Sequence, residues 1–185
     1  MLTIFIFQTT MLMYMKVFRT VIALVFIALM LAGSFAGCAA PVPDASGFNM
    51  IFKYGITAKN ELNTFEGSYT KDMIMDPPIT VDMVLSEEEL DIILQKMMEI
   101  DFINYPDRFA VEVAPGEMMG QRTPFPSYYF KVEYDSQVKE LWWDDKIINE
   151  SEKADRLREL INLIIGIIES KEEYKKLPAP RGGYA

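Results

Sequence analysis

The sequence predicts an α+β domain of two layers, in which an antiparallel sheet of about four to six strands carries two amphipathic helices on one face. Three observations predict this class. Short segments with apolar residues at every second position recur through residues 48–143, as in strands that are buried on one side. Two longer segments, 86–100 and 149–177, carry apolar residues at helical spacing. No internal repeat is visible, so we expect a single domain over residues 48–177.

The first half of this domain is expected to contribute three strands. Phe48 to Ile56 alternate between large apolar and polar side chains and predict the first strand. Leu62 to Lys71 is a weaker second strand, because Gly67 interrupts it. Pro77-Pro78 is expected to close this unit, and alternation from Ile79 to Leu85 predicts the third strand.

The first helix is predicted to begin at Glu87. Ser86 is a suitable N-cap, and Glu89 stands where its side chain can bond back to the Ser86 amide. The acidic run over residues 87–91 is therefore interpreted as the first turn of a helix rather than as a cation site, since carboxylates there meet the positive end of the helix dipole. The expected apolar stripe consists of Leu90, Ile93, Leu94, Met97 and Ile100.

The second half is expected to form a strand, a hairpin and a long helix. Phe109, Val111 and Val113 suggest a short strand, and residues 114–126 form a loop rich in proline and glycine. Alternation over 128–134 and 138–143, around a turn at Asp135-Ser-Gln137, predicts a hairpin whose other face, with Tyr129, Lys131 and Glu133, meets water. The last helix should begin near Asn149 or Ser151 and end near Leu177. Within it, Gly166 costs about 1 kcal/mol relative to alanine and allows a close backbone contact.

The first forty residues are interpreted as a targeting segment. Lys16 and Arg19 precede an apolar stretch, and small residues follow up to Gly37, which is the three-part plan of a secretory signal. We therefore assign residues 1–37 to a signal peptide. Because a signal usually opens with its basic end, the pattern favours translation from Met15 or a misassigned extension over residues 1–14.

The end of this segment, Phe35-Ala36-Gly37-Cys38, resembles the lipobox of bacterial lipoproteins, with Phe35 at the position where leucine is commonest. The resemblance implies that the Cys38 thiol receives a diacylglyceryl group and that signal peptidase II then cleaves before it. Cys38 is the only cysteine of the chain, and thioether formation requires a thiolate. Two or three acyl chains, each methylene adding about 0.8 kcal/mol, would anchor the chain stably at the extracytoplasmic side of the cell membrane.

Two other interpretations of the segment remain open. Thr20 to Ala40 is just long enough to span a membrane as an uncleaved anchor. Cleavage after Ala40 would instead use Cys38 and Ala40 as the small residues of an ordinary signal site. The lipoprotein interpretation is preferred because it alone gives the sole cysteine a role. Residues 38–47 would then be a lipidated linker, and residues 178–185 an extended tail.

Composition excludes several classes of function. After residue 37 the chain has 16 basic and 27 acidic residues, a formal charge of −11, so nucleic acid and anionic lipid surfaces are poor partners. The chain has no histidine and no cysteine besides Cys38, which removes the commonest general base and the soft metal ligands. No phosphate-binding loop, nucleophile elbow, calcium loop or metalloprotease motif occurs. We therefore assign no catalytic residue, metal or cofactor.

Four residues are candidates for an interaction surface. Trp142 and Trp143 precede two aspartates, and aromatic faces with carboxylates can hold a sugar or a cationic ligand. Neighbouring strand residues point to opposite faces, so only one of the two tryptophans can belong to the core. Phe125 and Met118, in the long loop, would supply adaptable apolar contacts. Ordinary packing is the competing interpretation of all four.

The sequence thus predicts a membrane-anchored extracytoplasmic lipoprotein whose small domain binds an envelope protein or a small ligand. An alternative is an envelope enzyme that uses paired carboxylates, for example on a glycan, with the two carboxyl groups about 5 to 9 Å apart. A third possibility is a structural role within a larger assembly.

Overall fold

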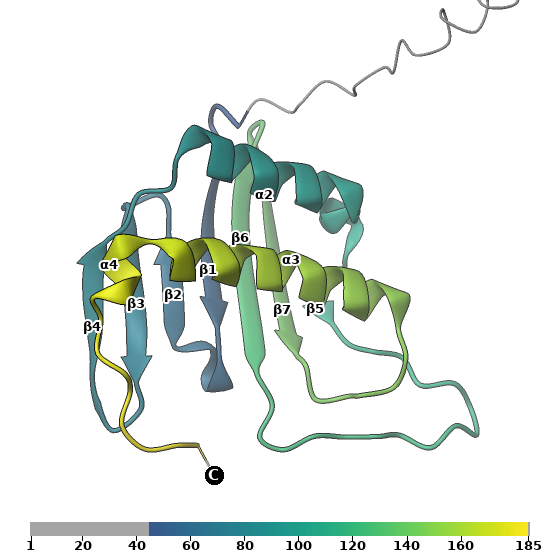
Figure 1. The fold of residues 1–185 in the computed structure, drawn as a ribbon. Helices are drawn as coiled ribbons and strands as arrows, with labels where there is room; N and C mark the ends of the chain where they lie inside the picture. Colours follow the sequence, from purple (N-terminus) through teal and green to yellow (C-terminus); the bar gives the residue numbers. More distant parts are fainter. Residues whose placement is uncertain (1–44, 185) are drawn as a thin grey trace, which may run out of the picture. The chain divides into compact units, whose positions relative to one another are not determined.

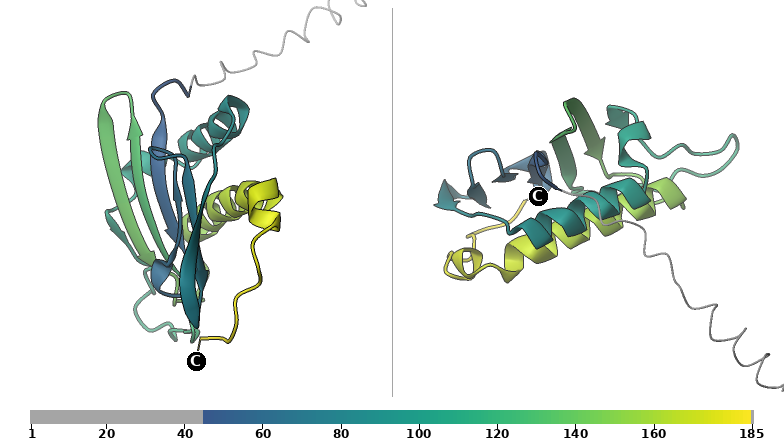
Figure 2. Two further views of the ribbon diagram at one scale, coloured as in Figure 1. Left: turned by 90° about the vertical axis from the view of Figure 1, so that its left-hand side faces the viewer. Right: turned by 90° about the horizontal axis from the view of Figure 1, so that it is seen from above.

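A seven-stranded sheet covered on one face by two helices forms the described part of the protein (Figures 1 and 2). The computed structural model describes residues 45–184. The strands follow the order β4-β3-β2-β1-β6-β7-β5, and all neighbours are antiparallel except β5 and β7. The predicted α+β class with two layers is confirmed. The sheet has more strands than expected, and one parallel pair makes it mixed.

The strands are β1 (Asn49–Tyr54), β2 (Asn60–Asn63), β3 (Ser68–Met73), β4 (Asp76–Asp82), β5 (Arg108–Phe109), β6 (Ser127–Tyr134) and β7 (Gln137–Asp144). The helices are α2 (Glu87–Glu99), α3 (Glu152–Ser170) and the short α4 (Glu172–Lys175), with single 3-10 turns η2 (Ile56–Ala58) and η3 (Phe102–Asn104). Among residues 45–184, no helix combines the length and the apolar character that crossing a bilayer requires. The predicted signal peptide, Cys38 and most of the predicted linker lie outside the described residues.

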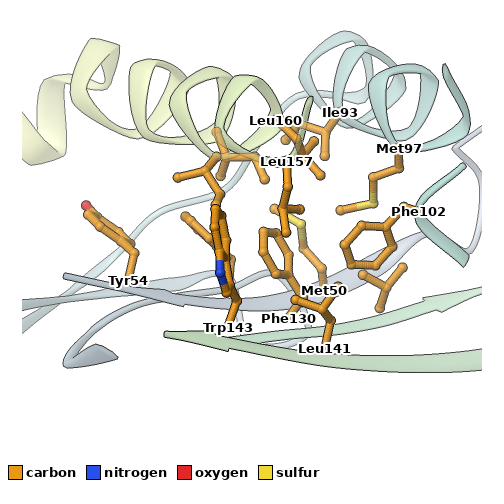
Figure 3. Packing of buried hydrophobic residues seen from close by; sticks show 14 of the residues in the cluster. Met50, Tyr54, Ile93, Met97, Phe102, Phe130, Leu141, Trp143, Leu157 and Leu160 are labelled. Atoms are coloured by element: carbon orange, nitrogen blue, oxygen red, sulfur yellow. The ribbon is translucent and has the colours of Figure 1, made fainter. Parts of the chain in front are cut away.

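The core fills the space between the sheet and the two helices (Figure 3). Side chains of β1, β6 and β7 that point to this face meet the apolar stripes of α2 and α3, which lie side by side and are joined by an ion pair between Lys96 and Glu159. The fully enclosed members include Met50, Phe52, Phe130, Leu141, Trp143, Ile93, Leu157 and Leu160. The chain from Val42 onward forms one compact unit that contains this entire core, so we expect this unit to fold without the residues before it.

The strongest local signals of the sequence predict their elements correctly. Ser86 Oγ accepts a hydrogen bond from the Glu89 amide, and Glu89 Oε2 accepts one from the Ser86 amide, which completes the capping box of α2. Ser151 caps α3 through its side chain alone, because Ser151 Oγ accepts a hydrogen bond from the Ala154 amide. The β6–β7 hairpin turns at Asp135 and Ser136, whose φ angles of 49° and 61° belong to a two-residue turn that matches the twist of the strands.

Two predictions for the first half of the domain are wrong about where strands begin and end. The segment expected as one strand over Leu62 to Lys71 is a hairpin of β2 and β3, because Gly67 (φ 61°) and the Asn63 side chain, which accepts bonds from two turn amides, fold it back. Pro77-Pro78 does not close this unit but lies inside β4. The prolines are tolerated there because β4 is an edge strand and its register with β3 shifts at this point.

Two further elements are shorter than expected. The strand predicted from Phe109 to Val113 is only the two residues of β5, paired in parallel with β7. The last helix does not continue to Leu177: α3 ends at Ser170, Lys171 adopts an extended conformation, and α4 follows. The Lys171 ammonium bonds to Glu89 at the start of α2, so the break joins the two helices.

The C-terminal residues contact the sheet at the edge formed by β3 and β4. Arg181 forms a bridge with Ile74 and an ion pair with Asp76. The Tyr184 hydroxyl donates to the carboxylate of Asp72. The contacts of Arg181 and Tyr184 therefore attach the predicted tail to the edge of the domain.

The expected close backbone contact at Gly166 is absent. Gly166 is exposed on α3, and a Cβ added there would meet no atom within 4 Å outside the helix's own backbone. Because alanine loses less conformational entropy than glycine in a helix, Gly166→Ala should raise the free energy of unfolding by about 0.5–1 kcal/mol. Urea denaturation followed by circular dichroism checks this. Unchanged or lower stability would reveal a role for the glycine beyond helix propensity.

Candidate functional site

An apolar groove opens between the end of α2, the turn η3 and the β6–β7 hairpin. Its volume is about 330 Å³, which lies at the lower end of the range for small-molecule sites. The floor and walls are formed by Leu94, Met97, Phe102, Val132 and Tyr134, and the rim by Met98, Asp101, Ile103, Asp135, Gln137 and Lys139. Met97 and Phe102 project from the helical side toward the sheet in Figure 3.

The end of α2 creates one wall of the groove. Asp101 takes the left-handed conformation (φ 57°), which ends the helix and turns the chain into η3. Asn104 stabilises this turn by donating from Nδ2 to both carboxylate oxygens of Asp101, at 2.9 and 3.0 Å. As a result Phe102 enters the core with 3% of its surface exposed, whereas Ile103 points outward and is 50% exposed.

The hairpin supplies the opposite wall. Val132 and Tyr134 point to the helix-covered face of β6, and Phe48 supports Tyr134 by an edge-to-face contact with ring centroids 6.4 Å apart. Lys139 of β7 lines the groove, and its ammonium lies 2.6 Å from a carboxylate oxygen of Asp107. The groove is therefore apolar at its base and charged only at its rim.

The structure separates the two tryptophans proposed for an interaction surface. Trp143 faces the helices and is 1% exposed, with the Arg158 guanidinium 5.2 Å above its ring and Phe109 against its edge. It is a core residue and is not accessible to a ligand, so its assignment to a surface is wrong. Trp142 points to the opposite, helix-free face, as the alternation of strand residues requires.

The other predicted surface residues do not gather into one site. Trp142 is partly buried against Tyr129, with ring centroids 5.8 Å apart, and its Nε1 donates to Asp144 Oδ1 over 3.3 Å. Phe125 is partly buried, whereas Met118, in the long loop, is 89% exposed. Because the tryptophans occupy opposite faces, the four residues form no common surface.

The buried carboxylate of Asp145 is structural. It is the only acidic residue of the described part of the chain that is buried, with 1% of its surface exposed. Arg158 donates to both of its carboxylate oxygens, from Nε over 3.0 Å and from Nη2 over 2.7 Å, and Arg122 donates to Oδ2 and to the backbone carbonyl. Since both oxygens are bound by arginines, this carboxylate is poorly suited to act as a general acid or base.

A second polar cluster lies beneath α4. The hydroxyl groups of Tyr54 and Tyr69 share a hydrogen bond of 2.8 Å, and burial raises the pKa of Tyr54 to about 12 and that of Tyr69 well above its usual value. The Lys71 ammonium lies 4.6 Å from the centre of the Tyr174 ring. This cluster joins α4 to the sheet. Within residues 45–184, no three acidic, histidine or cysteine side chains come together as a metal site would require.

Sequence reasoning missed the groove, although two residues carried a signal. Met98 lies off the apolar stripe of α2, and Ile103 lies in a segment without periodicity, so neither has an obvious place in a core. Apolar residues outside the periodic pattern can mark an exposed contact surface. The groove's geometry and chemistry are thus the basis for assigning a function. No protein-family model matches the sequence, and no curated protein matches it significantly.

Proposed function

We propose that the protein is a lipid-anchored extracytoplasmic binding protein, attached to the cell membrane through Cys38, whose domain holds a small apolar ligand in the groove at the end of α2. The groove carries this proposal. It combines buried apolar walls with half-exposed Met98 and Ile103 at its opening, which is the composition of a ligand pocket. Apart from the Tyr134 hydroxyl, the side chains of its floor and walls are apolar, which favours binding of an apolar ligand.

The described chain begins beside α2 and one wall of the groove. The Ala45 amide donates to Asp91 of α2, and Phe48 contacts Tyr134 of the groove wall. Seven residues lead from Cys38 to Ala45, and a fully extended chain of that length spans about 25 Å. A lipid on Cys38 would therefore keep this end of the domain within that distance of the bilayer.

Membrane attachment is tested by metabolic labelling with a palmitate analogue. The wild-type protein should incorporate the label and Cys38→Ser should not, because a hydroxyl cannot replace the thiolate in thioether formation. Intact-mass analysis of the membrane fraction should find Cys38 as the first residue of the mature chain. Label in the serine variant, or an unmodified Cys38 in the native protein, would contradict the proposal.

Binding in the groove is tested with Nile red, an uncharged dye whose emission shifts to the blue in apolar surroundings. The unit that begins at Val42 should bind it, and Met98→Glu, which places a charge at the opening, should weaken binding about tenfold or more. Met118→Glu is the matched control, because Met118 is 89% exposed and does not line the groove. Equal loss in both variants, or in neither, would place the dye elsewhere.

A further inference from the structure

We propose that the groove selects amphiphiles that have a single alkyl chain and a cationic head group. This inference rests on the proposed function, because it names the ligand class of the same groove. Leu94, Met97 and Phe102 are almost fully buried and present an apolar floor. Alkyl surface transferred from water to this floor gains about 25 cal/mol per Å², and methionine side chains adapt to a flexible chain.

Two carboxylates at the rim set the preference for the head group. Asp101 and Asp135 both line the opening and are exposed. Within residues 45–184, neither forms an ion pair, and the partner of Asp101, the Asn104 amide, is neutral. The one cation of the lining, Lys139, lies 2.6 Å from Asp107, so that pair adds little net charge. The rim is therefore negative.

The end of α2 adds to this negative potential. A helix C-terminus carries the equivalent of about half a negative charge, and α2 ends at Glu99, two residues before Asp101. The basic residue of its last turn, Lys96, does not offset this charge, because its ammonium bonds to Glu99 at 2.9 Å and to Glu159 at 2.8 Å. A cationic head group at the rim would be attracted by both the carboxylates and the helix end, and an anionic head group would be repelled.

The experiment compares three ligands with the same alkyl chain: decyltrimethylammonium, decyl maltoside and decanoate, each below its micellisation concentration. Calorimetric titration of the unit from Val42 should give an affinity for the cation about tenfold higher than that for decanoate, which corresponds to about 1.4 kcal/mol. The maltoside should lie between them. The preference should shrink as salt is added, since rim charges are screened.

The double variant Asp101→Asn, Asp135→Asn should reduce the ratio of the cation's affinity to that of decanoate, leaving only the part that the helix end supplies. Both positions have positive φ, which asparagine tolerates, and asparagine at 101 still offers one oxygen to the Asn104 amide. The control, Asp82→Asn with Glu133→Gln, removes the same charge from exposed residues outside the groove. It should keep the preference.

The outcomes separate the two proposals. If all three ligands bind equally to the wild-type unit, the head-group selectivity is overturned and the apolar groove remains a binding site. A preference that is reduced equally in the control variant would also overturn it, because net charge and not the rim would be responsible. If no ligand binds and Nile red does not bind either, the groove itself is not a site and the proposed function fails.

Discussion

Trp143→Ala is expected to lower the free energy of unfolding by about 3–5 kcal/mol. Trp143 is among the largest fully buried side chains, and Phe109, Tyr128 and Arg158 all contact its ring. Alanine would lose this apolar burial and leave a cavity that its neighbours cannot fill. Urea denaturation monitored by far-ultraviolet circular dichroism gives the change directly, and Trp143→Phe provides a milder variant if the alanine form does not fold.

The adjacent Trp142 is the matched control. It lies on the helix-free face, partly exposed and paired mainly with Tyr129, so Trp142→Ala should cost about 1 kcal/mol. Fluorescence separates the two residues, because each variant retains one tryptophan. The Trp142→Ala protein, which retains the buried Trp143, should emit at a shorter wavelength than the Trp143→Phe protein, which retains the partly exposed Trp142. Equal costs for the two alanine variants would contradict the assignment of the two faces.

Asp145→Ala should cost about 3 kcal/mol, at the lower end of the range for breaking a buried ion pair. The substitution leaves the guanidinium groups of Arg122 and Arg158 without their shared acceptor. Water can reach both in part, since 41% and 28% of their side-chain surfaces are exposed, and this limits the loss. Thermal and urea unfolding measure the change.

The control for Asp145 is an exposed ion pair on α3, the helix that carries Arg158. Glu152 bonds to Arg156 one turn later and is 78% exposed, so Glu152→Gln should change stability by no more than about 0.5 kcal/mol. A small effect of Asp145→Ala, similar to that of Glu152→Gln, would mean that the arginines find other acceptors. The loop over residues 114–126, which carries Arg122, would then be held in place by contacts other than the one to Asp145.

The parts of the fold that the sequence predicted are those determined by neighbours in the chain. The capping box at Ser86, the alternation along β6 and the turn at Asp135 involve residues a few positions apart, so each could be read from a short window. The split of β2 from β3 was missed because Gly67 was interpreted as an interruption of one strand rather than as the turn between two. The pairing of β5 with β7 joins Phe109 to Trp143 and leaves no local pattern.

The candidate site was missed for the same reason. The groove exists because the end of α2, near residue 100, lies against a hairpin that turns at residue 135, and no local pattern in the sequence predicts that contact. The tryptophan pair attracted attention because its composition is unusual, yet alternation along β7 already implied that one of the two is enclosed. Composition thus identified conspicuous residues, whereas the cavity depends on long-range packing.

The borders of the sheet have a consequence for the proposed attachment to a membrane surface. Confinement to two dimensions brings copies of a chain together far more often than free diffusion in solution does, and an unpaired strand can then recruit a strand from a neighbouring copy. Here one border, β4, carries Pro77-Pro78 at a shifted register, and the other, β5, is only two residues long. The two prolines remove backbone donors from the β4 border, so we expect crowded copies not to extend the sheet through β4.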